Sequence, residues 1–233
     1  SYAQCRGARD VGCQLIFGSG VGSPEPTDIQ DTDCLVLIGS HLGENMHNSQ
    51  VQELAQAVER KVPIIVVDPR FSVAASKARY WLPVKPGTDL ALLLAWANLL
   101  VTEGRYDKAF VDKYGHGFDK FAAEIKGYTV EWAAQETGVS ADLIRAAAVE
   151  FSSHRPATVI HPGRRVNWYG DDTQRSRAIA LLNALLGSYG RKGGLFISQG
   201  MKIAPYPLPK YPESSKLHAD NPNVWHWMSD HFP

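Results

Sequence analysis

Two short runs of consecutive apolar residues dominate the hydrophobic pattern of the first third of the chain. The first run, CLVLI, covers residues 34–38 and stops at Gly39, and the second, IIVV, covers residues 64–67 and stops at Asp68. Their length and β-branched content are typical of strands that are buried on both faces. A polar segment with helical periodicity, residues 44–61, separates them. The pattern therefore predicts a β-α-β unit with parallel strands and a right-handed crossover.

The spacing of apolar residues predicts further elements along the chain. Residues 157–160 form a third buried run, and residues 81–84 predict a short or edge strand because Pro83 has no N–H for a sheet ladder. The segment that opens at Thr88 or Asp89 is apolar on nearly every side, so we expect a helix that is covered on most faces. Further helices are expected over residues 107–114, 118–125, 129–137, 140–152 and 173–186.

Six helices allow a finer prediction, three of their buried face and three of their ends. The stripe expected in the helix over 44–61 is Val51, Leu54, Ala55 and Val58, and a weaker one near the N-terminus is Val11, Leu15 and Ile16. The helix over 173–186 should bury Ile179, Leu182, Leu185 and Leu186. The natural capping residues are Thr88 or Asp89, Thr129 and Ser140, with Gly138 as a helix stop.

These elements predict an α/β fold of parallel, Rossmann-like layers with a small helical region inserted or appended. We expect residues 1–104 to form the nucleotide-binding part and residues 105–156 the small helical region. Residues 157–198 then form a strand, a loop and a helix beside the site, and residues 199–233 an irregular C-terminal segment.

Composition and charge exclude several classes of protein. Lys plus Arg and Asp plus Glu balance at 24 each, so no global field favours nucleic acid or an anionic membrane. No run approaches the roughly 18 apolar residues that a membrane helix needs. Cys5, Cys13 and Cys34 show neither CxxC spacing nor an even-numbered disulfide framework. The chain starts at Ser1 without Met or a signal peptide, and we expect it to be part of a longer protein.

Candidate binding residues follow the first strand, because ligands of parallel sheets bind beyond the carboxyl ends of the strands. Gly39, Ser40 and His41 form that turn. A Gly-Ser turn at a helix N-terminus offers backbone N–H groups and a hydroxyl to a phosphate. The alternative is that Gly39 simply allows a tight turn, and the spacing does not separate the two readings.

Two carboxylates are candidates for the nucleoside of a cofactor. Asp68 follows a strand by one residue, where a carboxylate accepts hydrogen bonds from ribose hydroxyls. The alternative is that Asp68-Pro69 only opens a turn. Asp89 matches the N1–H and 2-amino donors of a guanine edge, and the alternative is a first-turn acid that complements the helix dipole.

The third strand end and the N-terminal segment add basic and sulfur groups. Arg164 and Arg165, with Tyr169 nearby, follow residues 157–160, and arginine pairs recognise oxyanions through forked hydrogen bonds. A solvated basic turn is the alternative. Cys5 is a candidate thiolate ligand for a metal, against the alternative of a small buried residue.

Three stretches in this order resemble the catalytic subunits of molybdopterin oxidoreductases of the dimethyl sulfoxide reductase superfamily. They are CLVLIGSHLGEN, VVDPRFSVAASKARYWLPVKPGTDLAL and HPGRRVNWYGDDTQRSRAIALLNALLGSYGRKGG. The last is most similar to polysulfide and thiosulfate reductases, with respiratory arsenate and tetrathionate reductases close by. The resemblance covers residues 1–197, and Arg79 departs from it, since relatives commonly have Asp there.

The resemblance implies a role for each matching residue. Cys5 would be the protein's own ligand to the metal, and Arg165 and Tyr169, with Arg164, would lie on the substrate side and act in catalysis. The residues that would bind a pterin guanine dinucleotide are Gly39, Ser40, His41, Glu44, Asn45, Asp68, Arg70, Gly87, Asp89 and Gly163.

The resemblance also implies an activity and its setting. The expected function is a segment of an enzyme with molybdenum (or tungsten) on two molybdopterin guanine dinucleotides. It would transfer two electrons to or from a small anionic sulfur or arsenic compound in anaerobic respiration. A [4Fe–4S] cluster outside this segment, an iron–sulfur electron-transfer subunit, a membrane anchor subunit and a periplasmic location are implied as well, without direct membrane insertion of this chain.

Two other classes of protein remain open from the sequence. One is a cofactor-free scaffold domain of a respiratory electron-transfer complex, which pterin extraction would separate from the enzyme. The other is a generic nucleotide-binding α/β domain, which would bind guanosine nucleotides without a pterin.

Overall fold

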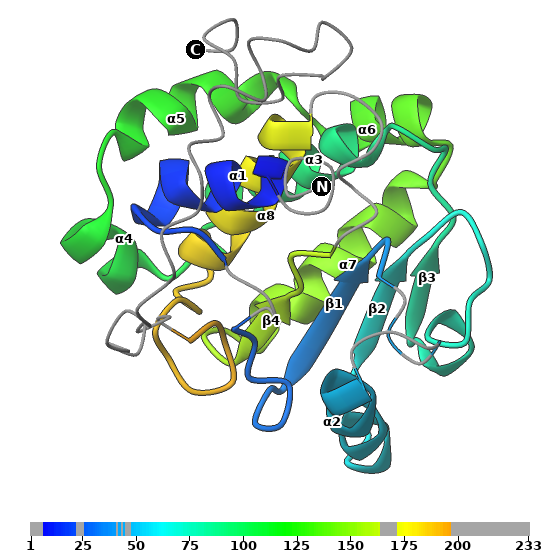
Figure 1. Ribbon diagram of the computed structural model, residues 1–233. Helices are drawn as coiled ribbons and strands as arrows, with labels where there is room; N and C mark the ends of the chain where they lie inside the picture. Colours follow the sequence, from blue (N-terminus) through cyan, green and yellow to red (C-terminus); the bar gives the residue numbers. More distant parts are fainter. Residues whose placement is uncertain are drawn as a thin grey trace, which may run out of the picture. The chain divides into compact units, whose positions relative to one another are not determined.

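The computed structural model divides the chain into two compact units, Ser1–Ser198 and Gln199–Pro233. Only residues of the first unit are described below, and Figure 1 shows their arrangement. The structure describes residues 7–21, 26–40, 42, 44, 48–163 and 172–196.

A four-stranded sheet with the strand order β3-β2-β1-β4 forms the centre of the fold. Every pair of neighbouring strands is parallel, which confirms the predicted α/β class. β3 is an edge strand, as Pro83 immediately after it predicts. The strands are β1 (Cys34–Ile38), β2 (Ile64–Val67), β3 (Tyr80–Leu82) and β4 (Thr158–Ile160).

The helices lie close to the predicted positions, although their ends shift by a few residues. Thr129 and Ser140 cap their helices through the side chain, accepting hydrogen bonds from the backbone N–H groups of Trp132 and Leu143. The described helices are α1 (Ala8–Phe17), α2 (Asn48–Glu59), α3 (Asp89–Thr102), α4 (Lys108–Tyr114), α5 (Phe118–Glu124), α6 (Val130–Thr137), α7 (Ala141–Ser153) and α8 (Asp172–Leu185).

One predicted cap is wrong. Thr88 occupies the N-cap position of α3 but makes no side-chain capping hydrogen bond. Its hydroxyl donates instead to the carbonyl oxygen of Lys85 at 2.7 Å. The hydroxyl therefore closes the turn before α3 and does not satisfy the first N–H groups of the helix.

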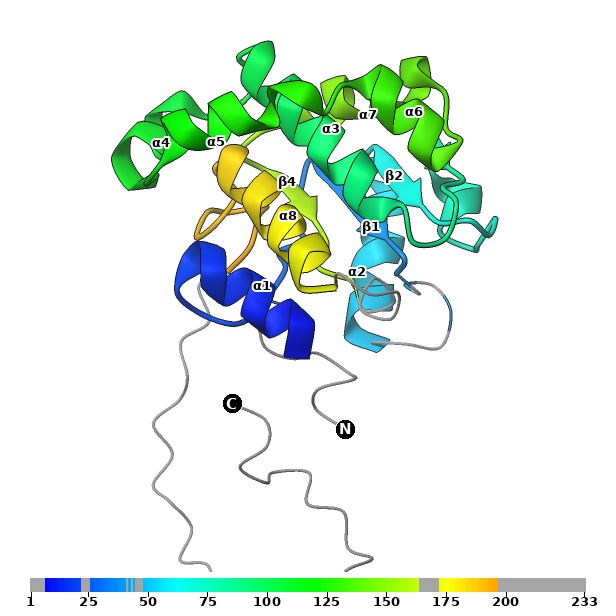
Figure 2. The ribbon, with the colours of Figure 1, turned by 90° about the horizontal axis from the view of Figure 1, so that it is seen from above.

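The sheet separates two apolar clusters because alternate strand residues point to opposite faces. Leu35 and Leu37 of β1 pack on the side of α2, whereas Val36 and Ile38 face the larger cluster with α3, α7 and α8. Figure 2 shows α2 apart from α3, α7 and α8, with the strands between them. Both faces of β1 are therefore covered, as the unbroken apolar run predicts.

α2 buries a face that differs in part from the predicted stripe. Leu54 and Ala57 are buried, whereas Ala55 is exposed. Gln50 is also buried, and its side-chain amide donates to the hydroxyl of Thr27 at 3.1 Å. The buried positions 50, 54 and 57 follow a four- and three-residue spacing, and the apolar character of Ala55 alone was misleading.

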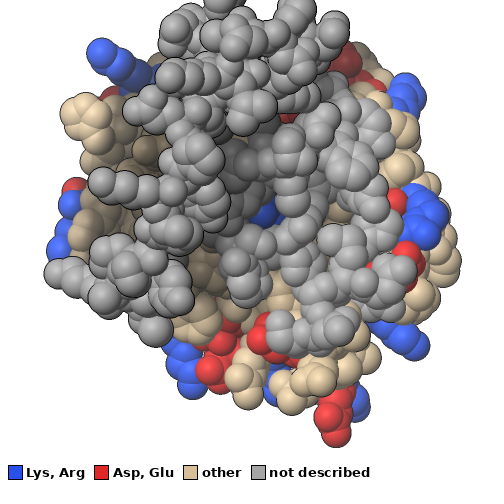
Figure 3. Space-filling model, viewed as in Figure 1, with Lys and Arg blue, Asp and Glu red and all other residues tan. Residues whose placement is uncertain are grey.

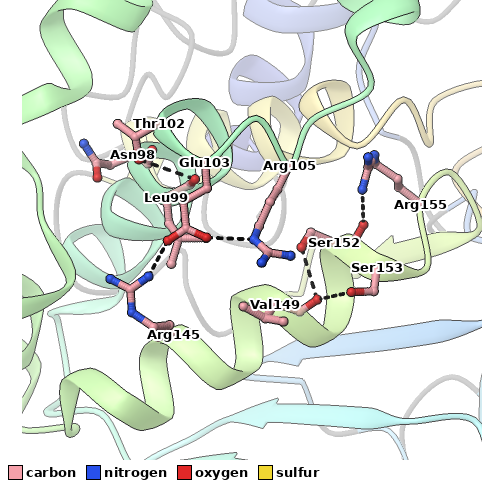
Figure 4. A network of polar contacts seen from close by, with 10 residues as sticks. All are labelled: Asn98, Leu99, Thr102, Glu103, Arg105, Arg145, Val149, Ser152, Ser153 and Arg155. Carbon is pink, nitrogen blue, oxygen red and sulfur yellow. Dashed lines mark hydrogen bonds and ion pairs between the residues drawn. The ribbon is translucent and has the colours of Figure 1, made fainter.

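α3 lies inside the larger cluster, as its apolar sequence predicts. Trp96 is fully buried and its indole N–H donates to the carbonyl oxygen of Ile144, while Asn98 donates to that of Ile125. These two hydrogen bonds hold the small helical region against α3. Figure 4 shows the polar contacts at the C-terminal end of α3, where Glu103 pairs with Arg145 of α7. Within the described residues, no helix combines the length and apolarity needed to cross a bilayer.

α1 packs closely on α8 through a face whose buried positions include Gly12. A Cβ added at Gly12 would lie 2.6 Å from the backbone N of Arg177, so only glycine fits there. Arg9 and Cys13 share the buried face. The predicted apolar stripe is therefore wrong for Val11 and Leu15, which are exposed, whereas Ile16 is partly buried against a small apolar cluster.

Candidate functional site

The carboxyl ends of the four strands meet at one edge of the sheet. Ile38 pairs with Val67, and Val67 pairs with Leu82, so β1, β2 and β3 end level with one another. β4 ends at the same edge, since the N–H of His161 donates to the carbonyl oxygen of Val36. Figure 1 shows the arrowheads of β1, β2 and β3 on one side. The turns that follow these strands contain the described candidates Gly39, Ser40, Asp68, Arg70, Gly87, Asp89 and Gly163.

Asp89, the first residue of α3, is half of a buried ion pair. Its Oδ2 lies 3.6 Å from Nη1 of Arg175 in α8, and the two side chains are 12% and 2% exposed. Arg175 also donates through Nη2 to Oδ1 of Asp172 at 2.8 Å. Burial raises the pKa of Asp89, the charge of Arg175 opposes this, and the charge of Asp68 adds to it. The structure thus places Asp68 and Asp89 within electrostatic reach of each other at this edge.

Asp68 has a local role that matches the alternative weighed above. Its Oδ1 accepts the backbone N–H of Arg70 at 2.9 Å, which closes the turn after β2. Its carbonyl oxygen accepts the indole N–H of Trp81 at 2.8 Å, which ties the turn to β3. Asp68 is buried, and its charge acts on Asp89. This contact does not distinguish a structural from a cofactor-binding role.

Glu44 and Arg70, two predicted cofactor ligands, bind each other. Oε2 of Glu44 accepts a hydrogen bond from Nη2 of Arg70 at 2.7 Å, and Oε1 accepts the backbone N–H of Val73 at 3.1 Å. The pair is partly exposed, and it bridges the segment after β1 to the turn after β2. Its electrostatic strength is that of a surface ion pair.

The structure corrects the prediction for the turn after β1 in one respect. The N–H of Gly39 donates to the carbonyl oxygen of Val67 at 2.9 Å, so it continues the sheet ladder and is not directed at a phosphate. Leu42 and Glu44 lie in turns and the described part of α2 starts at Asn48, so the Gly39-Ser40 turn does not directly precede the helix N-terminus. Gly39 has a φ of 53°, which supports the tight-turn alternative. Ser40 is buried at the same edge.

The turn before α3 leaves open space beside Asp89. Gly87 has a φ of 86°, and no atom of the described residues lies within 4 Å of a Cβ built on it. A backbone that is bare on one side allows close approach of a flat ligand such as a purine. The geometry of this turn is therefore compatible with the predicted guanine site.

Gly163, after β4, is held by a buried arginine. Nη1 of Arg9 donates to the carbonyl oxygen of Gly163 at 2.8 Å, and the N–H of Gly163 donates to Nδ1 of His161 at 3.0 Å. Asn183 in α8 bonds both the N–H and the carbonyl oxygen of Ile160. These contacts connect α1, β4 and α8 just before the predicted arginine pair.

Six predicted site residues lie outside the described part of the chain, and their roles stay predictions: Cys5, His41, Asn45, Arg164, Arg165 and Tyr169. Among the described residues, no group of His, Cys, Asp and Glu is arranged to hold a metal. Burial raises the pKa of Cys13 to about 12 and raises that of Cys34 as well, so both are thiols at neutral pH.

Two buried arginines were missed by the sequence reasoning, although the sequence contains a signal for one of them. Arg175 precedes Ile179 and Leu182 by four and seven residues, so it falls on the apolar face of α8. A cation in that position predicts a buried partner. Arg9 shows no comparable pattern, because its helix packs through Gly12 instead of an apolar stripe.

The described residues on the face drawn in Figure 3 form no large patch of a single charge. Figure 3 shows Lys and Arg interspersed with Asp and Glu over the described part of the face seen in Figure 1. This agrees with the balance of 24 basic and 24 acidic residues. The charged residues that shape the strand ends are the buried Asp68, Asp89 and Arg175.

The parallel sheet and the acidic turns at its carboxyl edge define an α/β domain of the kind that binds ligands beyond the ends of its strands. The family described as molybdopterin oxidoreductase matches residues 5–231. The chain is 33% identical over 210 residues to the thiosulfate reductase molybdopterin-containing subunit PhsA of Salmonella typhimurium. It therefore belongs to the molybdopterin oxidoreductase family, as the resemblance of the three motifs predicted.

Other relatives differ in the activity that their names state. The dimethyl sulfoxide reductase DmsA of Escherichia coli is 32% identical over 221 residues. The acetylene hydratase from Pelobacter acetylenicus has a similar structure, with a TM-score of 0.74 and 32% identity over 80% of this chain and 25% of that one.

The matches cover most of this chain but only part of the relatives. The chain spans about a quarter of their length, with 86% of this chain and 27% of PhsA aligned, and 85% and 27% for DmsA. The comparisons show an oxidoreductase family domain whose family uses a molybdopterin cofactor.

Proposed function

We propose that the chain is a segment of the catalytic subunit of a molybdenum (or tungsten) bis-pterin-guanine-dinucleotide oxidoreductase acting on a sulfur or arsenic compound. The observation that supports it most is the pair of buried carboxylates Asp68 and Asp89, brought together beyond the ends of parallel strands in a chain of this family. The similarity to PhsA favours a sulfur compound.

The described residues fit the guanosine end of such a cofactor. The ionised carboxylate of Asp89 would accept two hydrogen bonds from a guanine edge, and Asp68 would accept from ribose hydroxyls. The open space beside Gly87 leaves room for the base. Cys5 would supply the protein's thiolate to the metal, and the bound group supplies the two-electron chemistry.

Residues near the metal would act on the substrate. Arg165, with Arg164 beside it, would hold an oxyanion through forked hydrogen bonds, and Tyr169 would donate a further one. Ser40, His41 and Asn45 would contact the phosphates. Arg9 would orient the turn that leads into the arginine pair, because it holds the carbonyl oxygen of Gly163.

We propose the partners by the same argument. Electrons would pass through a [4Fe–4S] cluster outside these residues to an iron–sulfur subunit, with a membrane anchor subunit and a periplasmic location. The name of PhsA calls that protein a molybdopterin-containing subunit, which fits an enzyme of several chains. The four-part division of residues 1–104, 105–156, 157–198 and 199–233 also remains a proposal.

Metal and pterin analysis of the full-length protein tests the proposal. We expect molybdenum or tungsten together with a fluorescent oxidised pterin and guanosine monophosphate after acid hydrolysis. A clean preparation without either metal, from cells supplied with both, would contradict the proposal that the protein is a molybdenum or tungsten enzyme. A metal-free and pterin-free protein would favour the scaffold domain.

Two substitutions test the assigned roles separately. Asp89→Asn keeps the shape but turns one acceptor into a donor, so we expect a loss of bound guanine. Cys5→Ala should abolish or redirect turnover while the pterins stay bound. Wild-type cofactor content in Asp89→Asn, or full turnover in Cys5→Ala, would remove the corresponding residue from the site.

A further inference from the structure

A single guanidinium group lies between two carboxylates at the N-terminal ends of α3 and α8. Arg175 makes a short hydrogen bond to Asp172, at 2.8 Å, and a longer ion-pair contact to Asp89, at 3.6 Å. Asp172 is one turn from Arg175 on the same helix, so it fixes the guanidinium with respect to α8. Asp89 belongs to a different helix, α3, and interacts with the positive charge of Arg175 over 3.6 Å.

The difference between the two distances has a chemical consequence. At 3.6 Å the Arg175–Asp89 contact is too long to be a hydrogen bond, yet close enough for strong attraction in a buried place. The arginine therefore stabilises the negative charge of Asp89 without the short directional bond it gives to Asp172. Such an arrangement suits a carboxylate whose oxygens bind something else.

The surroundings of Asp89 otherwise oppose its negative charge. Burial raises its pKa, and Asp68, from the turn after β2, raises it further. Arg175, from α8, is the described cation that lowers it, together with backbone N–H groups at the start of α3. Without Arg175, two nearby buried carboxylates would remain with no described cation facing Asp89, and one of them would take up a proton more readily.

We propose that Arg175 is a positioning residue that keeps Asp89 ionised and oriented, so that the site selects guanine. This rests on the proposed function, in which Asp89 binds the guanine edge. An ionised carboxylate only accepts, and it matches the N1–H and 2-amino donors of guanine. A protonated Asp89 presents one donor and one acceptor, which matches the N1 acceptor and 6-amino donor of adenine instead.

The test uses the full-length protein isolated with its cofactor. Wild type, Arg175→Met, Arg175→Lys and Asp172→Asn are each incubated between pH 4 and pH 8 and separated from released material. Guanosine monophosphate after hydrolysis and pterin fluorescence then report what the protein retains at each pH. Circular dichroism at each pH reports the fold independently.

We expect the midpoint of acid-induced guanine loss to rise by about one pH unit or more in Arg175→Met. In Arg175→Lys, which keeps the charge, the midpoint should rise less. This variant provides the test if Arg175→Met does not fold. Asp172→Asn should leave the midpoint unchanged or lower it, because Arg175 keeps its charge next to Asp89 and loses a competing carboxylate. A purely structural role would move the Arg175 and Asp172 variants in the same direction.

The outcomes separate this inference from the function it rests on. A wild-type protein that contains no pterin contradicts the proposed function, and the inference fails with it. A pterin-containing wild type with Arg175→Met and Arg175→Lys midpoints equal to its own overturns the inference alone. An upward shift in Asp172→Asn as large as that in Arg175→Met also overturns it.

Discussion

The two ends of α3 contain the same chemical pair in opposite surroundings. At the N-terminal end Asp89 faces Arg175, and their side chains are 12% and 2% exposed. At the C-terminal end Glu103 pairs with Arg105 and with Arg145, and Glu103 and Arg145 are 33% and 47% exposed. Figure 4 shows the second group, with the carboxylate of Glu103 directed at Arg105 and at Arg145 of α7.

The pKa values of the two carboxylates shift in opposite directions. Hydrogen bonding by Arg105, with help from Arg145, lowers the pKa of Glu103. Burial raises the pKa of Asp89 in spite of Arg175. An arginine partner therefore does not by itself lower the pKa of a carboxyl group when water is excluded. A buried carboxylate under such opposition marks a candidate site, whereas the exposed pair at the other end is ordinary surface chemistry.

The largest expected difference follows from removing the arginine at each end. Arg175→Met leaves Asp89 and Asp172 without their buried cation, and we expect a loss of about 3–5 kcal/mol of unfolding free energy. Arg145→Met is the matched control, and it should cost less than about 1 kcal/mol, since Glu103 keeps Arg105 and contacts water. Denaturant titration of the full-length variants measures both.

Equal losses of unfolding free energy in these two variants would contradict the proposed difference between the two ends of α3. A small loss in Arg175→Met would mean that the buried pair is energetically neutral, as for ion pairs whose desolvation cancels their attraction. A large loss in Arg145→Met would mean that the exposed ion pairs of Glu103 contribute more to the unfolding free energy than surface ion pairs usually do.

The second-largest expected effect concerns the two glycines that flank α3. Gly87 and Gly104 have φ values of 86° and 65°, and neither has an atom within 4 Å of an added Cβ. Alanine at either position should cost about 1 kcal/mol through backbone strain alone. Because Gly87 lies beside Asp89, we expect only Gly87→Ala to lower the guanine and pterin content of the purified protein.

Gly104→Ala is therefore the control for strain without a ligand. Matching thermal midpoints for the two variants, with cofactor lost only from Gly87→Ala, would locate the ligand at the N-terminal end of α3. Cofactor lost equally from both would mean that general destabilisation, and not contact with the base, empties the site.

The same contrast shows which parts of the molecule can be predicted from the sequence. The strands and α3 follow from local apolar runs that each contain their own signal. The edge position of β3 follows from Pro83, since one missing N–H decides it. The N–H of Gly39 could not be assigned from local sequence, because its partner Val67 belongs to another strand.

The site was predictable only as far as strand ends define it. The sequence places Asp68 and Asp89 in turns after strands, and parallel topology then brings those turns to one edge. That Arg175 stands between Asp89 and Asp172 depends on how α8 packs against α3, a contact between segments far apart in the chain. Likewise the face of α1 depends on a backbone approach at Gly12.

The smallest expected effect concerns the acid range, where the two carboxylates should contribute with opposite sign. Glu103 has its pKa lowered from 4.5, so its contribution to stability is present above that pH and is lost as the pH falls through the native value. Asp89 has its pKa raised from 3.8, so its ionisation costs stability as the pH rises above 3.8 toward the native value.

The neutral variants Glu103→Gln and Asp89→Asn isolate these two contributions. From pH 3 to pH 6, the stability of wild type relative to Glu103→Gln should rise by less than about 1 kcal/mol, because the pair is exposed. Relative to Asp89→Asn it should fall over the same range, on top of a constant offset from the altered contact with Arg175. Amide hydrogen exchange, corrected for the intrinsic rate at each pH, measures the opening of each end of α3 separately. Two differences that change in the same direction would show that burial does not distinguish the ends, and that the charge balance at Asp89 is set by something other than its exclusion from water.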